Sequence, residues 1–256
     1  MVSMLIIPDI HARNDVPNEH LEWAGNLIID KKPDYVVSLA DLFDFPSLSS
    51  WDKGKMAAEN RRYAYDIDAG VKAQERLFKP LTDYNRARKH KYQPTRIFTM
   101  GNHEHRLFRA INDDAKLEFT IDPEDMQLYS FWDEIVPFKE STEVGGMFLS
   151  HYFPNGLMDK AISGKTVGAA LIAKMHRSAA QGHSHVLNMH TEAGVDGNRM
   201  WGLSCGWWGH ETQVEDYVSK TIQKTWFRCL IYLHNLENGN CDPEVFSMER
   251  VKELYA

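Results

Sequence analysis

An α/β fold is predicted by three features of the 256-residue sequence. Short apolar runs rich in β-branched and aromatic residues recur along the chain, amphipathic segments long enough for helices separate them, and polar residues follow five of the runs. The runs cover 4–7, 35–39, 96–100, 147–150 and 179–181. This order is typical of buried strands joined by crossovers, and ligands of open α/β sheets bind at the carboxyl ends of the strands.

The first crossover is predicted to be a helix over about 19–30, which ends at Lys31-Lys32-Pro33. The second is much longer. From Pro46 to Pro94 the chain has few glycine or proline breaks and apolar residues at helical intervals, which predicts one or two long helices, mostly unbroken until Pro80. A crossover needs far fewer residues, so we expect a helical insertion at about 46–95 that forms a subdomain or cap.

Further helices are predicted over 104–112, 122–132 and 166–177. Beyond the fifth run, 187–191, 199–204 and 225–233 alternate in polarity and are interpreted as strands of a second sheet. Asp196-Gly197-Asn198 is the expected turn of a hairpin. A chain of this length can bury a core without covalent staples, so we predict one domain over 1–256.

The composition is that of an ordinary globular protein, with 43% hydrophobic and 25% charged residues. No apolar stretch approaches a membrane span, and the first residues have neither the basic region nor the apolar core of a signal peptide. We therefore expect a cytoplasmic protein. Its three cysteines, Cys205, Cys229 and Cys241, lack metal-type spacing and are expected to be reduced thiols.

The net charge of −7 is unevenly distributed along the chain. The segment 51–96 contains twelve Lys and Arg residues against six Asp and Glu residues, a local charge of +6. Its charges form either the solvated face of long helices or a patch where a polyanion such as nucleic acid docks. The segment is the predicted insertion, so it adjoins the loop that follows the second strand.

Seven metal-binding side chains follow the five apolar runs: Asp9, His11, Asp41, Asn102, His151, His183 and His185. Any one of them alone is more often a cap, a turn residue or a buried histidine. Together they form a set of imidazole, carboxylate and amide ligands without thiolate, which suits divalent metals that activate water. In two-metal sites the ions lie about 3.5–4 Å apart, with a carboxylate between them. We expect manganese, although iron, zinc and nickel suit these ligands equally.

The motifs Asp9-x-His11, Asp41-x-x-Asp44, Gly101-Asn102-His103-Glu104, His151 and Gly182-His183-x-His185 resemble the five ordered motifs of the calcineurin-like metallophosphoesterases. The resemblance spans about two-thirds of the chain and agrees in order, residue type and placement after strands. It implies a four-layer α/β/β/α sandwich and a dinuclear metal-dependent phosphoester hydrolase.

The resemblance also implies a role for each residue by its position. Asp9, His11, Asp41 and His185 would hold one metal, Asp41 would bridge, and Asn102, His151 and His183 would complete the second site. His103 would be the general acid and Asp44 the carboxylate that orients it, with the expectation that Asp44 raises the pKa of His103. The alternatives are a further metal ligand for His103 and a helix or turn cap for Asp44.

Two positions depart from the family pattern. Ala40 stands where glycine usually precedes the bridging aspartate, and Phe45 stands where phosphoprotein phosphatases place a phosphate-clamping arginine. Arg13 and Arg106 lie near His11 and His103 and are candidate substitutes, or else ordinary surface residues. The missing arginine argues against a protein phosphatase.

The sequence therefore predicts a phosphodiesterase or nuclease that acts on nucleic acid or nucleotides. The alternatives are a phosphomonoesterase, including a phosphoprotein phosphatase, and a non-catalytic scaffold of the same fold. Trp207 or Trp208 could stack on a base, or pack in the core or at a subunit contact. The other histidines are interpreted as structural; the strongest alternative claims to function are those of His105 and of His210, which follows the glycine-bearing stretch 204–209.

Overall fold

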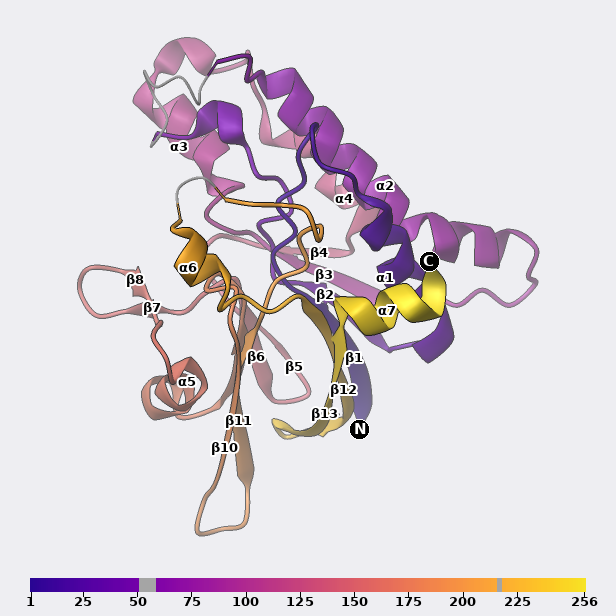
Figure 1. Cartoon of the computed structure of the whole chain (residues 1–256). Coiled ribbons are helices and arrows are strands. Elements are labelled where there is room, and N and C mark those ends of the chain that lie inside the picture. The colour runs from indigo at the N-terminus through magenta and orange to yellow at the C-terminus, as the bar shows by residue number, and fades with distance from the viewer. Residues whose placement is uncertain (51–58, 216–217) are drawn as a thin grey trace.

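Two β-sheets pack face to face between layers of helices (Figure 1). A computed structural model describes residues 1–50, 59–215 and 218–256. The larger sheet has the strand order β13-β12-β1-β2-β3-β4, and the smaller sheet has the order β10-β11-β9-β6-β5. A separate small hairpin is formed by β7 (Pro154–Asn155) and β8 (Lys160–Ala161).

The larger sheet is mixed. The strands β1 (Val2–Ile7), β2 (Tyr35–Ser38), β3 (Thr95–Thr99) and β4 (Glu134–Val136) pair in parallel. The strand β12 (Cys229–Glu237) pairs antiparallel with both β1 and β13 (Asn240–Ser247). The smaller sheet contains β5 (Thr142–Val144), β6 (Met147–Ser150), β9 (Ser178–Gln181), β10 (Leu187–Ala193) and β11 (Arg199–Cys205). In this sheet β6, β9 and β11 are parallel.

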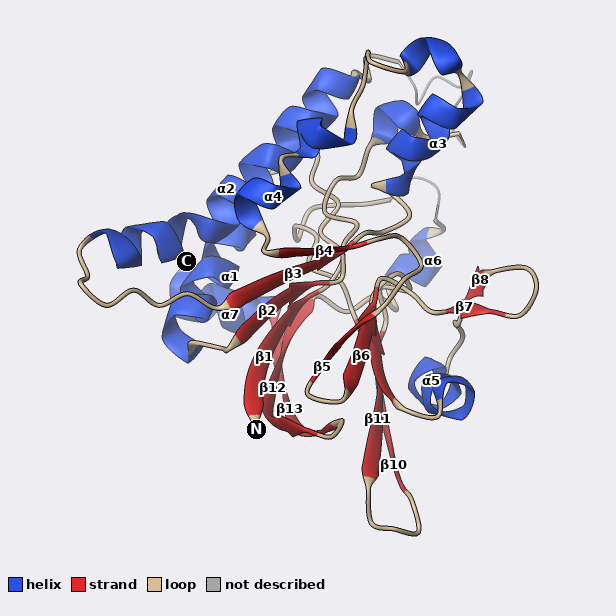
Figure 2. Ribbon diagram, turned by 180° about the vertical axis from the view of Figure 1, so that it is seen from behind, coloured by secondary structure: helices blue, strands red, loops and turns tan. Residues whose placement is uncertain are grey.

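Helices cover the outer faces of both sheets (Figure 2). The larger sheet is covered by α1 (Glu19–Lys31), α2 (Tyr63–Arg86) and α7 (Met248–Tyr255), and the smaller by α5 (Val167–Met175). The remaining helices are α3 (His105–Asp113), α4 (Leu128–Phe131) and α6 (Lys220–Gln223), with 3₁₀ turns at Pro46–Leu48, Ala115–Leu117 and Pro123–Met126.

The alternation of side chains along β1 explains the layers. Met4 and Ile6 belong to the core between the two sheets, whereas Leu5 and Ile7 point into the core under α1 and α2. A third core lies between α5 and the smaller sheet, where Leu171 packs against Ala179. The predicted four-layer α/β/β/α sandwich is confirmed by this arrangement.

The long crossover between β2 and β3 is part of the helical layer. Its main element, α2, packs against α1 and buries Leu77 and Phe78 in the core. The helix continues through Pro80, so the prediction that it breaks there is wrong. Gly25 of α1 allows this close approach, because a Cβ there would overlap the Leu77 carbonyl and lie 2.8 Å from Pro80 Cγ. Residues 51–58 of the predicted insertion lie outside the described residues.

Two other predicted elements are wrong in part. The strand expected at 225–233 in the second sheet begins at Cys229 and joins the larger sheet, where it pairs with β1. The helix expected over 122–132 is two short pieces, because Gln127 adopts the left-handed conformation with φ 52° between them. The hairpin turn at 196–198 is confirmed, with Gly197 at φ 82° and β10 paired to β11.

Within the described ranges, no helix is both long enough and apolar enough to span a membrane. The three cysteines are buried free thiols. Burial raises the pKa of Cys229 and Cys241 to about 12, so both thiols are protonated at neutral pH.

The close contact of α1 with α2 predicts the effect of Gly25→Ala. The added methyl has no space, so the helices must separate, and we expect a loss of about 1–3 kcal/mol of unfolding free energy in urea denaturation. Asn26→Ala, at the next, partly exposed position of α1, is the control and should change it by less than about 0.5 kcal/mol. Equal effects of the two substitutions would contradict this account.

Candidate metal centre

The loops that follow five strands meet at one edge of the two sheets. Asp9 and His11 follow β1, Asp41 follows β2, Asn102 follows β3, His151 follows β6, and His183 and His185 follow β9. Three of the groups of potential metal ligands that form there are Asp9 with His11 and His185, Asp41 with His151 and His183, and His11 with Asp41 and His103. Within each group the ligand atoms lie within 4.8 Å of one another. The structure thus brings all seven predicted ligands together, and their division between two cations stays a prediction.

His151 is the centre of one group. Its Nε2 lies 2.9 Å from Asn102 Oδ1, 3.2 Å from His183 Nδ1 and 3.3 Å from Asp41 Oδ2. Its Nδ1 donates a hydrogen bond of 2.7 Å to the Leu39 carbonyl, which places the proton of the neutral ring on that atom. The Nε2 lone pair then faces other acceptors, an arrangement that a shared cation stabilises.

The protonation states of His183 and Asp41 suit a cation, whereas His151 must lose a proton to bind one, because its pKa is lowered by burial but raised more by Asp41 and Asp9. Burial, followed by the charge of His151, lowers the pKa of His183 to about 4, so its ring is neutral and able to coordinate. Burial raises the pKa of Asp41, but His103, His151 and His11 outweigh burial and hold that pKa well below normal. Asp41 is therefore ionised at neutral pH, as a bridging carboxylate must be.

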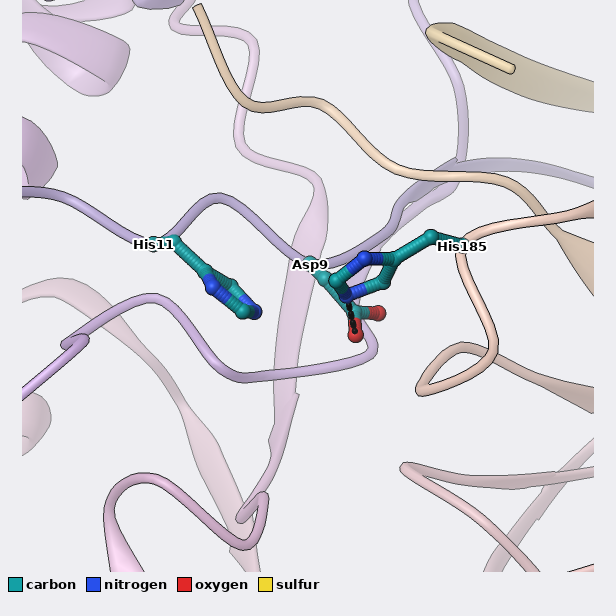
Figure 3. A group of neighbouring side chains, drawn as sticks. All are labelled: Asp9, His11 and His185. Atoms are coloured by element: carbon teal, nitrogen blue, oxygen red, sulfur yellow. Dashed lines mark hydrogen bonds and ion pairs between the residues drawn. The ribbon is translucent and has the colours of Figure 1, made fainter. Parts of the chain in front are cut away.

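Asp9, His11 and His185 form another of these groups and point toward one another (Figure 3). His185 Nε2 lies 3.1 Å from Asp9 Oδ2. His11 Nε2 is buried without a hydrogen-bond partner and lies 3.7 Å from Asp41 Oδ2. A cation at this position would satisfy the orphaned nitrogen, so the residues present fit a metal, and Asp41 Oδ2 faces both groups.

Two glycines and one glutamate build the loops that carry the carboxylates. A Cβ on Gly101 would overlap Asp41 Oδ1, and a Cβ on Gly182 would overlap Asp9 Oδ1. The buried Glu104 carboxylate accepts hydrogen bonds from the backbone N–H groups of Asp41, Leu42, Phe43 and Gly101 at 2.8–3.1 Å. Burial and the nearby Asp41 raise the pKa of Glu104 to about 7, although its bond from Phe43 lowers it.

Ala40 and Asp41 both adopt positive φ, 69° and 41°. This is the left-handed region, which explains why glycine is usual at the position of Ala40; an alanine there costs about 1–2 kcal/mol. Phe45, also at positive φ, is buried in the core and stacks on Phe43 and Tyr63. The side chain at the position of the phosphatase arginine therefore contributes to packing.

His103 lies beside the two groups and is paired with Asp44. Its Nδ1 lies 2.7 Å from Asp44 Oδ1, and its Nε2 lies 3.8 Å from Asp41 Oδ2. The expectation that the pKa of His103 is raised is wrong in its net direction. Burial lowers this pKa, and the charges of His11 and Arg106 add to that effect, which outweighs the opposing effects of Asp41 and Asp44.

The two candidate substrate arginines both have protein partners. Arg13 forms ion pairs with Asp44 and Glu215. Arg106 donates to the Asp44 carbonyl at 2.7 Å and to His103 Nε2 at 2.9 Å. Glu215 is a site residue that sequence reasoning did not identify, because it follows no strand and belongs to no motif of the family.

A cleft of about 300 Å³ is lined by His103, Arg106 and Trp226 together with five of the seven predicted ligands, namely His11, Asp41, Asn102, His183 and His185. Trp207 and Trp208, by contrast, are 1% and 0% exposed and pack in the interior, so they do not stack on a substrate base. Trp226 is half-buried, with its ring 4.3 Å from that of His185. His105 stacks on Phe138 and His210 pairs with Glu19, and neither lines the cleft.

Substitution of either motif glycine tests the geometry of the centre. Gly182→Ala and Gly101→Ala should displace the adjacent carboxylates, and we expect Mn²⁺ affinity in calorimetric titrations to fall about 10- to 100-fold. Gly156→Ala is the control: its φ of 67° makes alanine strained there too, but the added Cβ meets nothing within 4 Å, so a loss confined to the motif variants reflects the displaced carboxylates. Unchanged affinity in both motif variants would show that the carboxylates are not held as ligands.

Comparison with protein-family models agrees with the geometry. The family model of the calcineurin-like phosphoesterases matches residues 2–186. Two similar solved structures are a novel archaeal phosphodiesterase (14% identity, 95% of this chain and 99% of that chain, TM-score 0.42) and the phosphoesterase Yfce from E. coli (12%, 96% and 99%, TM-score 0.42). No curated protein matches the sequence. The chain belongs to the calcineurin-like phosphoesterase family and is a metal-dependent hydrolase.

Proposed function

We propose that the chain is a dinuclear metal-dependent phosphodiesterase acting on nucleotides or nucleic acid. The observation that carries the proposal is the meeting of two ligand groups at Asp41 Oδ2, with His103 Nε2 3.8 Å from the same oxygen. Asp9, His11 and His185 would hold one cation and Asn102, His151 and His183 the other, with Asp41 shared. Two bound divalent cations would supply Lewis acidity toward phosphoryl oxygens and activate water.

Because burial lowers the pKa of His103, its Nε2 must first take up a proton from solvent, and protonated His103 then supplies that proton to the leaving oxygen. Its Nδ1 contact with Asp44 fixes the ring so that Nε2 faces the cleft. Arg106 now donates to that Nε2, and a guanidinium has only donors, so the two groups cannot keep this contact once Nε2 is protonated. Arg106 then needs another acceptor, and a phosphoryl oxygen in the cleft provides one.

The arrangement of arginines favours a diester. A phosphomonoester dianion carries more charge than a diester and gains more from a dedicated guanidinium clamp. Here the clamp position is Phe45, buried in the core, and Arg13 is already paired with two carboxylates. This supports a substrate with a single phosphate charge.

Trp226 supports the nucleotide part of the proposal. It presents an aromatic ring in the cleft beside His185, where a base could stack. The basic segment 51–96 supports nucleic acid less strongly. Arg61 lines the cleft, but Lys72, Lys79 and Arg96 pair with acids on or near their own elements. Residues 51–58 of this segment lie outside the described residues.

A hydrolysis panel tests the reaction class. The Mn²⁺-loaded protein should hydrolyse bis-p-nitrophenyl phosphate with higher kcat/KM than p-nitrophenyl phosphate, and chelation of the metal should abolish both activities. His103→Ala should lower kcat by about 10²- to 10⁴-fold, because the leaving oxygen loses its acid. Preference for the monoester, with dinucleotides, DNA and RNA left intact, would contradict the diester proposal.

Trp226 provides a test of the nucleotide preference. Trp226→Ala should lower kcat/KM for a dinucleotide by about 5- to 100-fold, because base stacking contributes about 1–3 kcal/mol. Trp226→Phe keeps an aromatic face and should retain most activity, and methyl p-nitrophenyl phosphate should be affected less than the dinucleotide. Equal losses on the two substrates would mean that Trp226 acts through His185 packing instead.

A further inference from the structure

We propose that Glu215 is a positioning residue that holds both halves of the catalytic machinery, His11 directly and the pair His103–Asp44 through Arg13. The inference rests on the proposed metal centre. Glu215 lies between β11 and α6, outside residues 2–186 matched by the family model. It is 0% exposed, although it is charged and lies in a loop.

The backbone around Glu215 is anchored on both sides. Gln223 accepts a hydrogen bond from the Glu215 N–H at 3.0 Å and donates one to its carbonyl at 2.6 Å. Gln213 donates to the His11 carbonyl at 2.9 Å and to Glu215 Oε1 at 3.2 Å. The carboxylate is therefore held against His11 by contacts other than its own charge.

One oxygen of Glu215 selects the tautomer of His11. Oε1 lies 3.2 Å from His11 Nδ1, and an ionised carboxylate only accepts hydrogen bonds. Nδ1 must then carry the proton of the neutral ring, which leaves the lone pair on Nε2, the buried nitrogen that faces Asp41. Such a partner behind a metal-binding histidine typically contributes 10- to 100-fold in metal affinity.

The other oxygen connects Glu215 to the proton donor. Oε2 pairs with Arg13 Nη2, and Arg13 Nε pairs with Asp44 Oδ2. Asp44 Oδ1 in turn contacts His103. Burial raises the pKa of Asp44, but Arg13 and His103 hold it far below its usual range, so Asp44 stays ionised. The rigid guanidinium fork sets the spacing of two carboxylates that would otherwise repel.

A third cation is the rival explanation for this cluster, since His11, Asp44 and Glu215 offer ligand atoms within 4.8 Å of one another. Arg13 argues against it. Its guanidinium already pairs with both carboxylates, so a divalent cation there would meet a fixed positive charge. The cluster is better described as a buried ion-pair network beside the metal site, at the wall of the same cleft.

Mn²⁺ titration by calorimetry, followed by steady-state kinetics on bis-p-nitrophenyl phosphate, tests the inference. Glu215→Ala should keep two cations per chain, weaken one of them by about 10- to 100-fold, and lower kcat. Glu215→Gln keeps an acceptor for His11 but loses the charge that pairs with Arg13, so it should weaken the metal less while still lowering kcat. Glu211→Gln, an exposed residue paired with Lys252, is the matched control and should behave as wild type.

Wild-type affinity and kcat in Glu215→Ala would overturn the inference. If Glu215→Ala loses its cooperative thermal transition, the isosteric Glu215→Gln is measured in its place. A wild-type kcat in Glu215→Gln would then overturn the inference. Three cations in the wild type and two in Glu215→Ala would make Glu215 a ligand, which also overturns it. A wild-type protein that binds no Mn²⁺ would instead refute the proposed function, so the two failures are distinguishable.

Discussion

Four backbone N–H groups converge on the buried carboxylate of Glu104, and the loop that carries Asp41 depends on this contact. Ala40 and Asp41 have positive φ, at a cost of about 1–2 kcal/mol each. A hydrogen bond contributes about 0.5–1.5 kcal/mol, so the four together are enough to offset that strain. Glu104 follows the same turn that carries Asn102 and His103, so one contact joins the loops after β2 and β3.

The two carboxylate oxygens of Asp41 have different roles, one in holding the loop and one in the predicted metal centre. Oδ1 accepts the backbone N–H of His103 at 2.9 Å, while Oδ2 faces His11, His103 and His151. The ligand histidines are held from behind by acceptors that fix their tautomers, Leu39 for His151 and Glu215 for His11. The positions and protonation states of these ligand histidines are thereby set by protein groups before any substrate binds.

The sequence is sufficient for the parts of this centre that repeat a local pattern. Asp9, Asp41 and His151 each follow a short apolar run, and the sheet brings those run ends together. It is insufficient where long-range contacts decide. Glu215 contacts His11 across 204 residues of sequence. The strand predicted near 225–233 pairs with β1 because alternating residues of β12 fill two different cores. Neither the contact nor the strand pairing can be derived from local sequence. The direction of the His103 pKa shift likewise depends on burial, which a motif does not reveal.

The central claim is that two cations share Asp41, and electron paramagnetic resonance of the Mn²⁺-titrated protein tests it most directly. We expect an exchange-coupled signal that reaches its maximum at two Mn²⁺ per chain and that is lost in Asp41→Asn, since coupling needs a bridging ligand. Signals of isolated Mn²⁺ at every ratio, or a coupled signal that survives Asp41→Asn, would contradict the account.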